Sequence, residues 1–465
     1  MTPQVHATDK TPSPFARAQA AFRDGKLPQA AALYRAAVTQ DPAHFAAWMN
    51  LGTCLRRMGQ LDAAIIAGTR ARALQPDNTG CLTNLGNALV DASRIDEALA
   101  LHRRALELAP DDLLVQRNLA VCLREAGQFD EAHARFTALA AHFPDEINLP
   151  WEQALCLLYQ ADYARGWPAF EARWKLPAMT ARWPHITRWQ GEDLAGKKIL
   201  LTEEQGFGDT LLCSRYLPAL IAQAGTEGGV TLACKKPLHH LLSAIDGLAL
   251  TTIEDAEKTA SVTGAYDYQA AMMSLPGIFR TDLGNIPPPA PLRGDVVLPP
   301  QVAQALQAGK GRMKVGIIWS GSVTFANNRK RSVTAERFMP LAGIEGVELY
   351  SLQKGPREHD LRPVGGSAVI HELGPHFEDF AQTAAALRQL DLVIMTDSAV
   401  AHLAGSLGVP VWNLLHDRPY WLYLDARADC PWYASMTLYR QPTPGDWDSV
   451  FAQVADDLRQ LAARA

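Results

Sequence analysis

Four prolines recur at one fixed interval in the first third of the 465-residue chain, 34 residues apart (76 − 42 = 34). They are Pro42, Pro76, Pro110 and Pro144. The other positions that keep the same register are Ala30, Ala64, Ala98 and Ala132, and Gly25, Gly59 and Gly127, with Ser93 in the third place. A fixed period of this length is typical of stacked helical hairpins that bury their apolar faces against one another. We therefore expect a helical solenoid whose exposed side is a binding surface.

The repeat resembles the tetratricopeptide unit. Small residues such as Gly52, Gly86, Ala64 and Ala98 let two helices approach closely, and the proline ends the second helix. We expect four repeats over residues 11–146, after a disordered segment over residues 1–10. A fifth, degenerate hairpin that lacks the proline is expected to cap them over residues 147–176.

Composition narrows the class of protein. With 48% apolar residues the chain has ample core for several domains, and the net charge of −5 gives no reason to expect a nucleic-acid partner. No apolar run reaches the length of a membrane span, and the N-terminus lacks the apolar core of a signal peptide. Seven cysteines without a CxxC pair favour a reducing compartment and argue against structural zinc. We expect a cytoplasmic protein.

Beyond about Trp189 short apolar strands alternate with helices, which indicates parallel sheets with helical crossovers. Helices are expected near 210–224 and 236–244, and a proline-rich passage over residues 285–300 separates two such series. The expected strands are Lys198–Thr202, Val230–Ala233, Leu248–Ile253 and Tyr266–Ala270, then Val315–Trp319, Val347–Leu352, Ala368–Ile370, Leu392–Met395 and Val409–Leu415. The pattern predicts two Rossmann-like lobes with a cleft between them, over residues 191–290 and 291–465, with capping helices and a linker over residues 147–190.

The first candidate loop follows strand Lys198–Thr202, and ligands of parallel sheets bind beyond such strand ends. Its glycines allow a tight turn, and either of the last two residues can cap the next helix. It is neither a GxGxxG nor a GxxxxGK motif, which removes the main support for nicotinamide binding or ATP hydrolysis. The residues expected to line this loop are Gln205, Gly206, Gly208, Asp209 and Thr210.

The second candidate loop turns directly from a buried strand into a helix at Asp397 and Ser398. Free N–H groups at Ser398 and Ala399 and the positive end of the helix dipole form a natural site for a diphosphate. Asp397 would repel a diphosphate unless it caps the helix or accepts hydrogen bonds from sugar hydroxyls, and these are the roles we assign it. His402, one turn into the helix, either donates to phosphate or is a packed core residue.

The third candidate loop follows strand Val315–Trp319 and is basic. It begins at Ser320 and contains three consecutive cations, of which Arg329 and Arg331 have the bidentate guanidinium geometry that suits phosphate. Such a run of charge is also common on solvated surfaces. Lys354, just past strand Val347–Leu352, is a further candidate.

Taken together, these loops resemble the bacterial heptosyltransferase-like glycosyltransferases of the GT-B fold, in a branch with tetratricopeptide repeats in front. The resemblance covers residues 161–447 through successive blocks, among them EQGFGDTLLCSRYLPAL, KVGIIWSGS, NNRKRSV, SLQKG, DLVIMTDSAVAHLAGSLGVPVW and CPWYASMTLYRQPTPGDW. It implies a nucleotide-sugar donor on the C-terminal lobe, an acceptor on the N-terminal lobe, and transfer without a metal or a resident cofactor.

The resemblance also implies residue roles. Asp209 becomes the general base that takes the proton of the acceptor hydroxyl in an inverting displacement. Donor binding falls to the cations and helix residues named above: Ser320, Arg329, Arg331, Lys354, Asp397, Ser398, Ala399 and His402. Departures from the family pattern stand at Asn328, where relatives often have aspartate, and at Tyr420 and Tyr423; either a changed donor or a weakened enzyme would explain them.

A repeat array in front of a sugar-transferring body suggests an acceptor protein held by the repeats, in the plan of O-GlcNAc transferases and of flagellin glycosyltransferases. We expect a protein O-glycosyltransferase that acts on flagellin or another surface protein. Two alternatives stay open: an enzyme of lipopolysaccharide or capsule assembly, and a non-catalytic scaffold.

Overall fold

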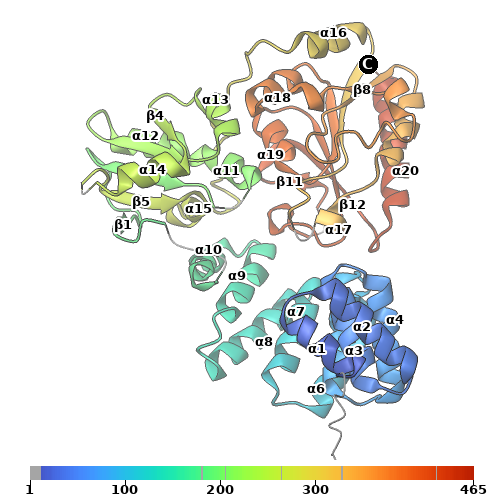
Figure 1. The fold of residues 1–465 in the computed structure, drawn as a ribbon. Coiled ribbons are helices and arrows are strands. Elements are labelled where there is room, and N and C mark those ends of the chain that lie inside the picture. Colours follow the sequence, from blue (N-terminus) through green and yellow to red (C-terminus); the bar gives the residue numbers. More distant parts are fainter. Residues whose placement is uncertain are drawn as a thin grey trace, which may run out of the picture. The chain divides into compact units, whose positions relative to one another are not determined.

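The computed structural model describes residues 12–177, 179, 182–204, 206–262, 264–325, 328–425 and 427–464. The segment 1–10, predicted to be disordered, lies outside this range. The chain divides into two compact units, Met1–Cys156 and Leu157–Ala465 (Figure 1). We describe each unit by itself.

The first unit consists of helices that pack in consecutive pairs. They are α1 (Pro14–Arg23) and α2 (Leu27–Gln40), α3 (Phe45–Arg57) and α4 (Leu61–Leu74), α5 (Thr79–Asp91) and α6 (Ile95–Leu108), and α7 (Leu113–Glu125) and α8 (Phe129–His142), followed by α9 (Leu149–Tyr159). Each repeated proline stands two residues beyond the second helix of a pair, as at Pro42 after Gln40. The predicted helical solenoid is confirmed.

One turn position within each hairpin keeps the 34-residue register in the backbone as well as in the sequence. Gly25, Gly59 and Gly127 have φ values of 74°, 73° and 77°, and Ser93 takes the same left-handed region at 58°. Ala161, the next position in register, has φ 58°. Left-handed backbone is uncommon for residues with a Cβ, so its presence at Ala161 shows that the turn between α9 and α10 (Tyr163–Phe170) has the same backbone conformation as the turns of the repeats.

Helix starts repeat in the same way. His44, Asn78 and Asp112 stand 34 residues apart (78 − 44 = 34) and cap α3, α5 and α7, each accepting the backbone N–H of the residue three positions on. Such caps satisfy one of the N–H groups that a helix start leaves unpaired. The capped helix starts therefore recur with the same 34-residue period as the prolines that end the repeats.

The small-residue contact expected at Gly86 is real. A Cβ on Gly86 would lie 2.7 Å from Nε2 of His102 on α6. His102 is fully buried, and neither ring nitrogen has a hydrogen-bond partner within the described part of the chain. Burial, with a smaller effect from Arg56, lowers the pKa of His102 from 6.5 to about 4.

The second unit contains two sheets. The first has the strand order β1-β5-β2-β3-β4, with every pair parallel. Its strands are β1 (Thr187–Arg188), β2 (Lys198–Thr202), β3 (Gly229–Ala233), β4 (Leu248–Thr251) and β5 (Tyr268–Ala271). Its helices are α11 (Phe207–Cys213), α12 (Leu217–Ala224), α13 (His239–Leu242), α14 (Ile253–Ala260) and α15 (Leu275–Ile278).

The second sheet has the order β11-β12-β10-β9-β6-β7-β8, parallel throughout except at the edge pair of β11 and β12. Its strands are β6 (Met313–Ile318), β7 (Val347–Ser351), β8 (His371–Glu372), β9 (Leu392–Thr396), β10 (Val411–Leu415), β11 (Asp429–Cys430) and β12 (Tyr433–Arg440). Its helices are α16 (Pro300–Ala308), α17 (Asn328–Arg331), α18 (Phe380–Leu387), α19 (Ala399–Ser406) and α20 (Trp447–Ala462). Strands such as β9 are buried along their whole length, as expected for a sheet covered on both faces.

The predicted alternation of strands and helices is confirmed, with local errors. The strand predicted at Ala368–Ile370 is wrong, because Gly366–Ala368 forms a 3-10 turn and the strand follows at His371–Glu372. Strands β1, β11 and β12 were not predicted. β12 alternates between buried and exposed positions and borders β11, so it lacks the continuous apolar run of a central strand.

Two general features complete the fold. All seven cysteines are buried free thiols. None of the helices described is both long and apolar enough to cross a membrane.

The contact between Gly86 and His102 predicts a position-specific cost for a single methyl group. Gly86→Ala should destabilise the chain by about 1–3 kcal/mol, since a Cβ would overlap the buried ring. Gly80→Ala, in the same helix with only Asn78 Oδ1 nearby at 3.4 Å, is the control and should be neutral or stabilise by about 0.5–1 kcal/mol. Urea unfolding of both variants measures the difference, and equal losses would contradict this packing.

The buried His102 predicts a loss of stability in acid. Its folded-state pKa lies below the ordinary value, so the unfolded chain binds the proton more readily and stability falls as the pH drops from about 6.5 towards 4. At pH 5 the loss should be about 2 kcal/mol. Comparing urea unfolding at pH 7 and pH 5 with the non-titrating His102→Leu variant isolates this contribution; the idea fails if both proteins respond equally.

Candidate functional site

The order of the strands gives each sheet of the second unit one topological switch point. In the first sheet the chain runs from β2 through β3 to β4 and then returns to β5 on the other side of β2. In the second sheet it runs from β6 through β7 to β8 and returns to β9 beside β6. Ligands of open parallel sheets bind at such switch points, beyond the carboxyl ends of the strands. The predicted loops after β2, β6 and β9 lie at these two points.

Asp209 lies in the first turn of α11, after β2. Its Oδ2 accepts the N–H of Gly206 at 2.9 Å, so the predicted capping interaction is present. Thr210 is buried, and its hydroxyl donates to the carbonyl of Gly206 at 3.5 Å. Burial is the main cause that raises the pKa of Asp209 from 3.8 to about 6; Glu204 and Asp397 raise it further, whereas the Gly206 N–H and Arg331 lower it.

The loops of the two sheets meet at α11 and α19, which pack against each other. A Cβ on Gly208 would lie 2.8 Å from Cδ2 of His402 and 3.6 Å from Cα of Ala399. The first turn of α11 therefore touches the first turn of α19. Gly208, Asp209, Ala399 and His402, predicted from separate motifs, therefore lie on two helix turns that contact each other.

Asp397 does not cap α19. Its Oδ1 accepts the hydroxyl of Tyr423 at 2.7 Å, and its Oδ2 lies 3.4 Å from Nη1 of Arg331. The cap role assigned from the sequence is wrong, because the carboxylate turns away from the helix towards these two donors. The N-cap residue is Ser398, whose Oγ is buried and has no hydrogen-bond partner in the described regions.

His402 is buried, and its Nδ1 lies 3.1 Å from the hydroxyl of Tyr433. Its Nε2 lies on the side of Gly208, 3.2 Å from the position of a Cβ there. Burial lowers the pKa of His402 to about 4, the nearby Asp397 opposes this shift, and Arg215 and Arg331 add to it. The ring is therefore neutral at pH 7.

The basic loop is organised around Asn328. Its side-chain nitrogen donates to Ser320 Oγ at 3.2 Å, and its oxygen accepts from Arg331 Nε at 3.3 Å. Ser320 is buried, and its hydroxyl also lies 3.0 Å from Ser332 Oγ. The amide of Asn328 thus bridges Ser320 and Arg331, and the hydroxyl of Ser320 is bonded within this loop.

The remaining predicted residues are dispersed. Arg329 is exposed on α17. Lys354 donates to the carbonyl of Phe377 at 2.5 Å, so its ammonium is bound to the backbone beyond β7. Gln205 lies outside the described residues.

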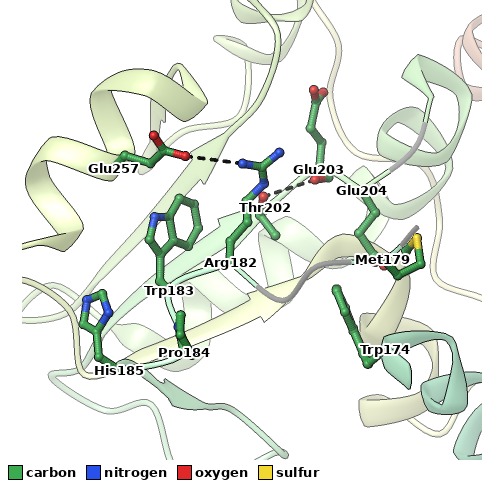
Figure 2. Close-up of a pocket in the computed structure, with 10 residues that line it drawn as sticks. All are labelled: Trp174, Met179, Arg182, Trp183, Pro184, His185, Thr202, Glu203, Glu204 and Glu257. Atoms are coloured by element: carbon green, nitrogen blue, oxygen red, sulfur yellow. Dashed lines mark hydrogen bonds and ion pairs between the residues drawn. The ribbon is translucent and has the colours of Figure 1, made fainter. Parts of the chain in front are cut away.

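A cavity of about 520 Å³ opens at the carboxyl end of β2, beside the loop that leads to Asp209 (Figure 2). Trp174 and Met179 lie on one side, and Arg182 and Trp183 on the other. Arg182 and Glu257 form an ion pair of 3.5 Å. The residues that line the cavity are Trp174, Met179, Arg182, Trp183, Pro184, His185, Thr202, Glu203, Glu204 and Glu257.

Two buried arginines near the site were not predicted. Arg173 pairs with Glu204 at 2.8 Å. Arg215, on the same stretch of chain as Asp209, donates to the carbonyls of Leu212, Pro287 and Trp432. Both residues pair with groups distant in sequence, for which the local pattern holds no signal.

Family models of the tetratricopeptide repeat match residues 15–79 and 89–149. The first part of the chain therefore carries tetratricopeptide repeats, a class of array that binds proteins or peptides. A curated relative, Protein FlbA of Caulobacter vibrioides, is 28% identical over 343 residues, which is 66% of this chain and 54% of FlbA. The chain thus spans about half the length of this relative.

Solved structures resemble about a third of the chain. YrrB, titled as a TPR protein with an unusual peptide-binding site, is 20% identical with a TM-score of 0.31, over 35% of this chain and 84% of its own. A thermophilic TPR protein from Thermus thermophilus is 17% identical with a TM-score of 0.31, over 35% and 90%. A structure of MamA is 16% identical with a TM-score of 0.31, over 34% and 92%.

The raised pKa of Asp209 predicts that its removal stabilises the chain at high pH. Ionisation costs the folded state stability as the pH rises from about 4 through 6. Because Asp209 is partly exposed, we expect Asp209→Asn to gain about 1–2 kcal/mol at pH 8 and almost nothing at pH 4.

The control is Asp255→Asn in the same sheet domain. Lys258 and Thr252 lower the pKa of Asp255, so its removal should reduce stability at pH 8. Thermal unfolding across pH measures both variants. A melting temperature of Asp209→Asn below the wild type at pH 8 would contradict the assigned environment.

Proposed function

We propose that the second unit is a GT-B, heptosyltransferase-like glycosyltransferase that moves a sugar from a nucleotide-sugar to a hydroxyl of a protein held by the repeats. The transfer is inverting and needs no metal. The observation that carries the proposal is the contact of Gly208 with His402 and Ala399. This contact brings Asp209, at the switch point of the first sheet, close to the N-terminus of α19, at the switch point of the second sheet.

The acceptor half of the reaction falls to Asp209. As the acceptor oxygen bonds to the anomeric carbon, its proton passes to the carboxylate. A pKa of about 6 leaves Asp209 ionised at pH 7 and close to the pH at which a base works best, a contribution of roughly 10²–10⁴ in rate. The cavity beside the loop offers room for the acceptor.

The donor half falls to the first turn of α19 and to Arg331. The bond from the anomeric carbon to the diphosphate breaks, and its electron pair stays on the diphosphate oxygen. N–H groups at a helix start, the hydroxyl of Ser398 and the guanidinium of Arg331 are suited to that negative charge. With the Tyr433 hydroxyl as donor to Nδ1, neutral His402 carries its proton on Nε2 and can donate as well.

The repeats bind the acceptor protein. An array of helical hairpins suits a peptide or protein segment, and binding it in the same chain raises its effective concentration at the cleft. Flagellin or another surface protein is our candidate by analogy of architecture. Seven unpaired thiols favour a reaction in the cytoplasm.

A nucleotide screen tests the donor half. Thermal-shift and calorimetric titration with UDP, GDP, ADP and CMP should identify one nucleotide that stabilises the chain. Arg331→Met should weaken that nucleotide's binding by at least about tenfold, because a charge-assisted contact to phosphate is lost. Arg337→Met, which loses the surface pair with Asp448 and the contact of its guanidinium with the Phe451 ring, should bind normally.

Asp209→Asn tests the base. It should bind the nucleotide as the wild type does and lose transfer to protein by about 10²-fold or more. No stabilisation by any nucleotide would refute the glycosyltransferase and leave a scaffold. Unchanged transfer in Asp209→Asn would refute the base.

A further inference from the structure

Arg173 lies on the 3-10 turn η1 (Glu171–Lys175) that follows α10. Its Nε donates to Oε1 of Glu204 at 2.8 Å, and its Nη2 donates to Oε2 at 3.0 Å. The two side chains are 1% and 2% exposed. This is a bidentate ion pair inside the second unit, and Glu204 stands five residues before Asp209 (209 − 204 = 5).

The remaining polar groups of the pair are also engaged. Nη1 of Arg173 donates to Glu171 Oε1 at 2.6 Å and to the carbonyl of Phe170. Nη2 also reaches Ser274 Oγ at 2.7 Å, and Glu204 Oε2 accepts the N–H of Met273 at 3.0 Å. One guanidinium therefore joins η1, the segment after β2 and the segment after β5. Strands β2 and β5, which precede two of these segments, lie side by side at the first switch point.

A buried ion pair is a poor means of gaining stability, because the cost of desolvating two charges offsets their attraction. Two arginine hydrogen bonds to one carboxylate do, however, fix its orientation. The pair is therefore expected to fix the orientation of the Glu204 side chain more than to stabilise the fold.

We propose that Arg173 is a positioning residue for the proposed transfer: by holding Glu204, it fixes the start of the segment that presents Asp209 to the cleft. This inference rests on the proposed function. It assigns a role to a residue that follows the repeat hairpins in the chain and belongs to none of the three ligand loops.

The charge of Glu204 gives the role a measurable consequence. Burial is the largest cause that raises the pKa of Asp209; among charges, Glu204 and Asp397 raise it and Arg331 lowers it. The positive charge of Arg173 offsets the negative charge of Glu204. Without the guanidinium the carboxylate of Glu204 should make Asp209 harder to ionise, and without that carboxylate Asp209 should ionise more easily.

The test uses the full chain and the variants Arg173→Met, Glu204→Gln and R173M/E204Q. The double variant removes both charges, so it can be studied even if the unpaired Glu204 prevents folding. Arg188→Met is the matched control, because Arg188 also stacks on Trp174 at 4.8 Å but pairs only weakly with Glu171, at 3.8 Å.

Hydrogen exchange is the first measurement, and it does not depend on catalysis. Exchange in peptides covering residues 203–213 should rise at least about fivefold in R173M/E204Q and stay unchanged in Arg188→Met. Unchanged exchange in the double variant would overturn the proposal.

The pH profile of transfer is the second measurement. The acid limb should move up by about half a pH unit in Arg173→Met and down in Glu204→Gln, with donor binding unchanged. A shift in the same direction, or none, would overturn the positioning role. Loss of protection in R173M/E204Q together with no transfer by the wild type would instead retain the anchor and refute the glycosyltransferase.

Discussion

The approach of α11 to α19 depends on the missing side chain of Gly208. Any Cβ there would lie 2.8 Å from the ring of His402, a distance that real contacts do not show, so the His402 ring or one of the two helices would have to move. Arg215 supports the same approach, since its guanidinium lies over the rings of Trp432 and Tyr433, and Tyr433 contacts His402. The loops at the two switch points meet because Gly208 has no side chain and because Arg215 packs on Trp432 and Tyr433.

This contact gathers three carboxylates, and the fold treats them differently. Glu204 is paired with Arg173, and Asp397 with Arg331 and Tyr423. Asp209 receives the backbone N–H of Gly206. An N–H stabilises a carboxylate less than a full cation does, so burial prevails and the pKa of Asp209 rises. The general-base role proposed for Asp209 thus depends on the fact that Glu204 and Asp397 are paired with arginines while Asp209 accepts only a backbone N–H.

Much of this could be predicted from sequence, and the part that could not has a common cause. The register of Pro42 and Gly25 predicts the array because each repeat obeys the same local rules, and β2 was predicted to the residue because it is a continuous apolar run. The loops after parallel strands could be placed at one edge by topology alone. The partners of Asp397 and Glu204 could not, since Tyr423 and Arg173 lie 26 and 31 residues away and bond by tertiary packing.

The turn between α9 and α10 shows the same competition between local and tertiary rules. Ala161 keeps the turn of the repeat, yet the register reaches position 178 without a proline, where the chain has Ala178. Trp167 on α10 donates to the carbonyl of Thr281 and packs at 5.3 Å against Trp421, so this helix contacts the segments that follow β5 and β10 in the second unit. Helix α10 already ends at Phe170, and the chain continues as η1, from which Arg173 reaches Glu204. The repeat pattern therefore ends where burial against the α/β unit begins to determine the sequence.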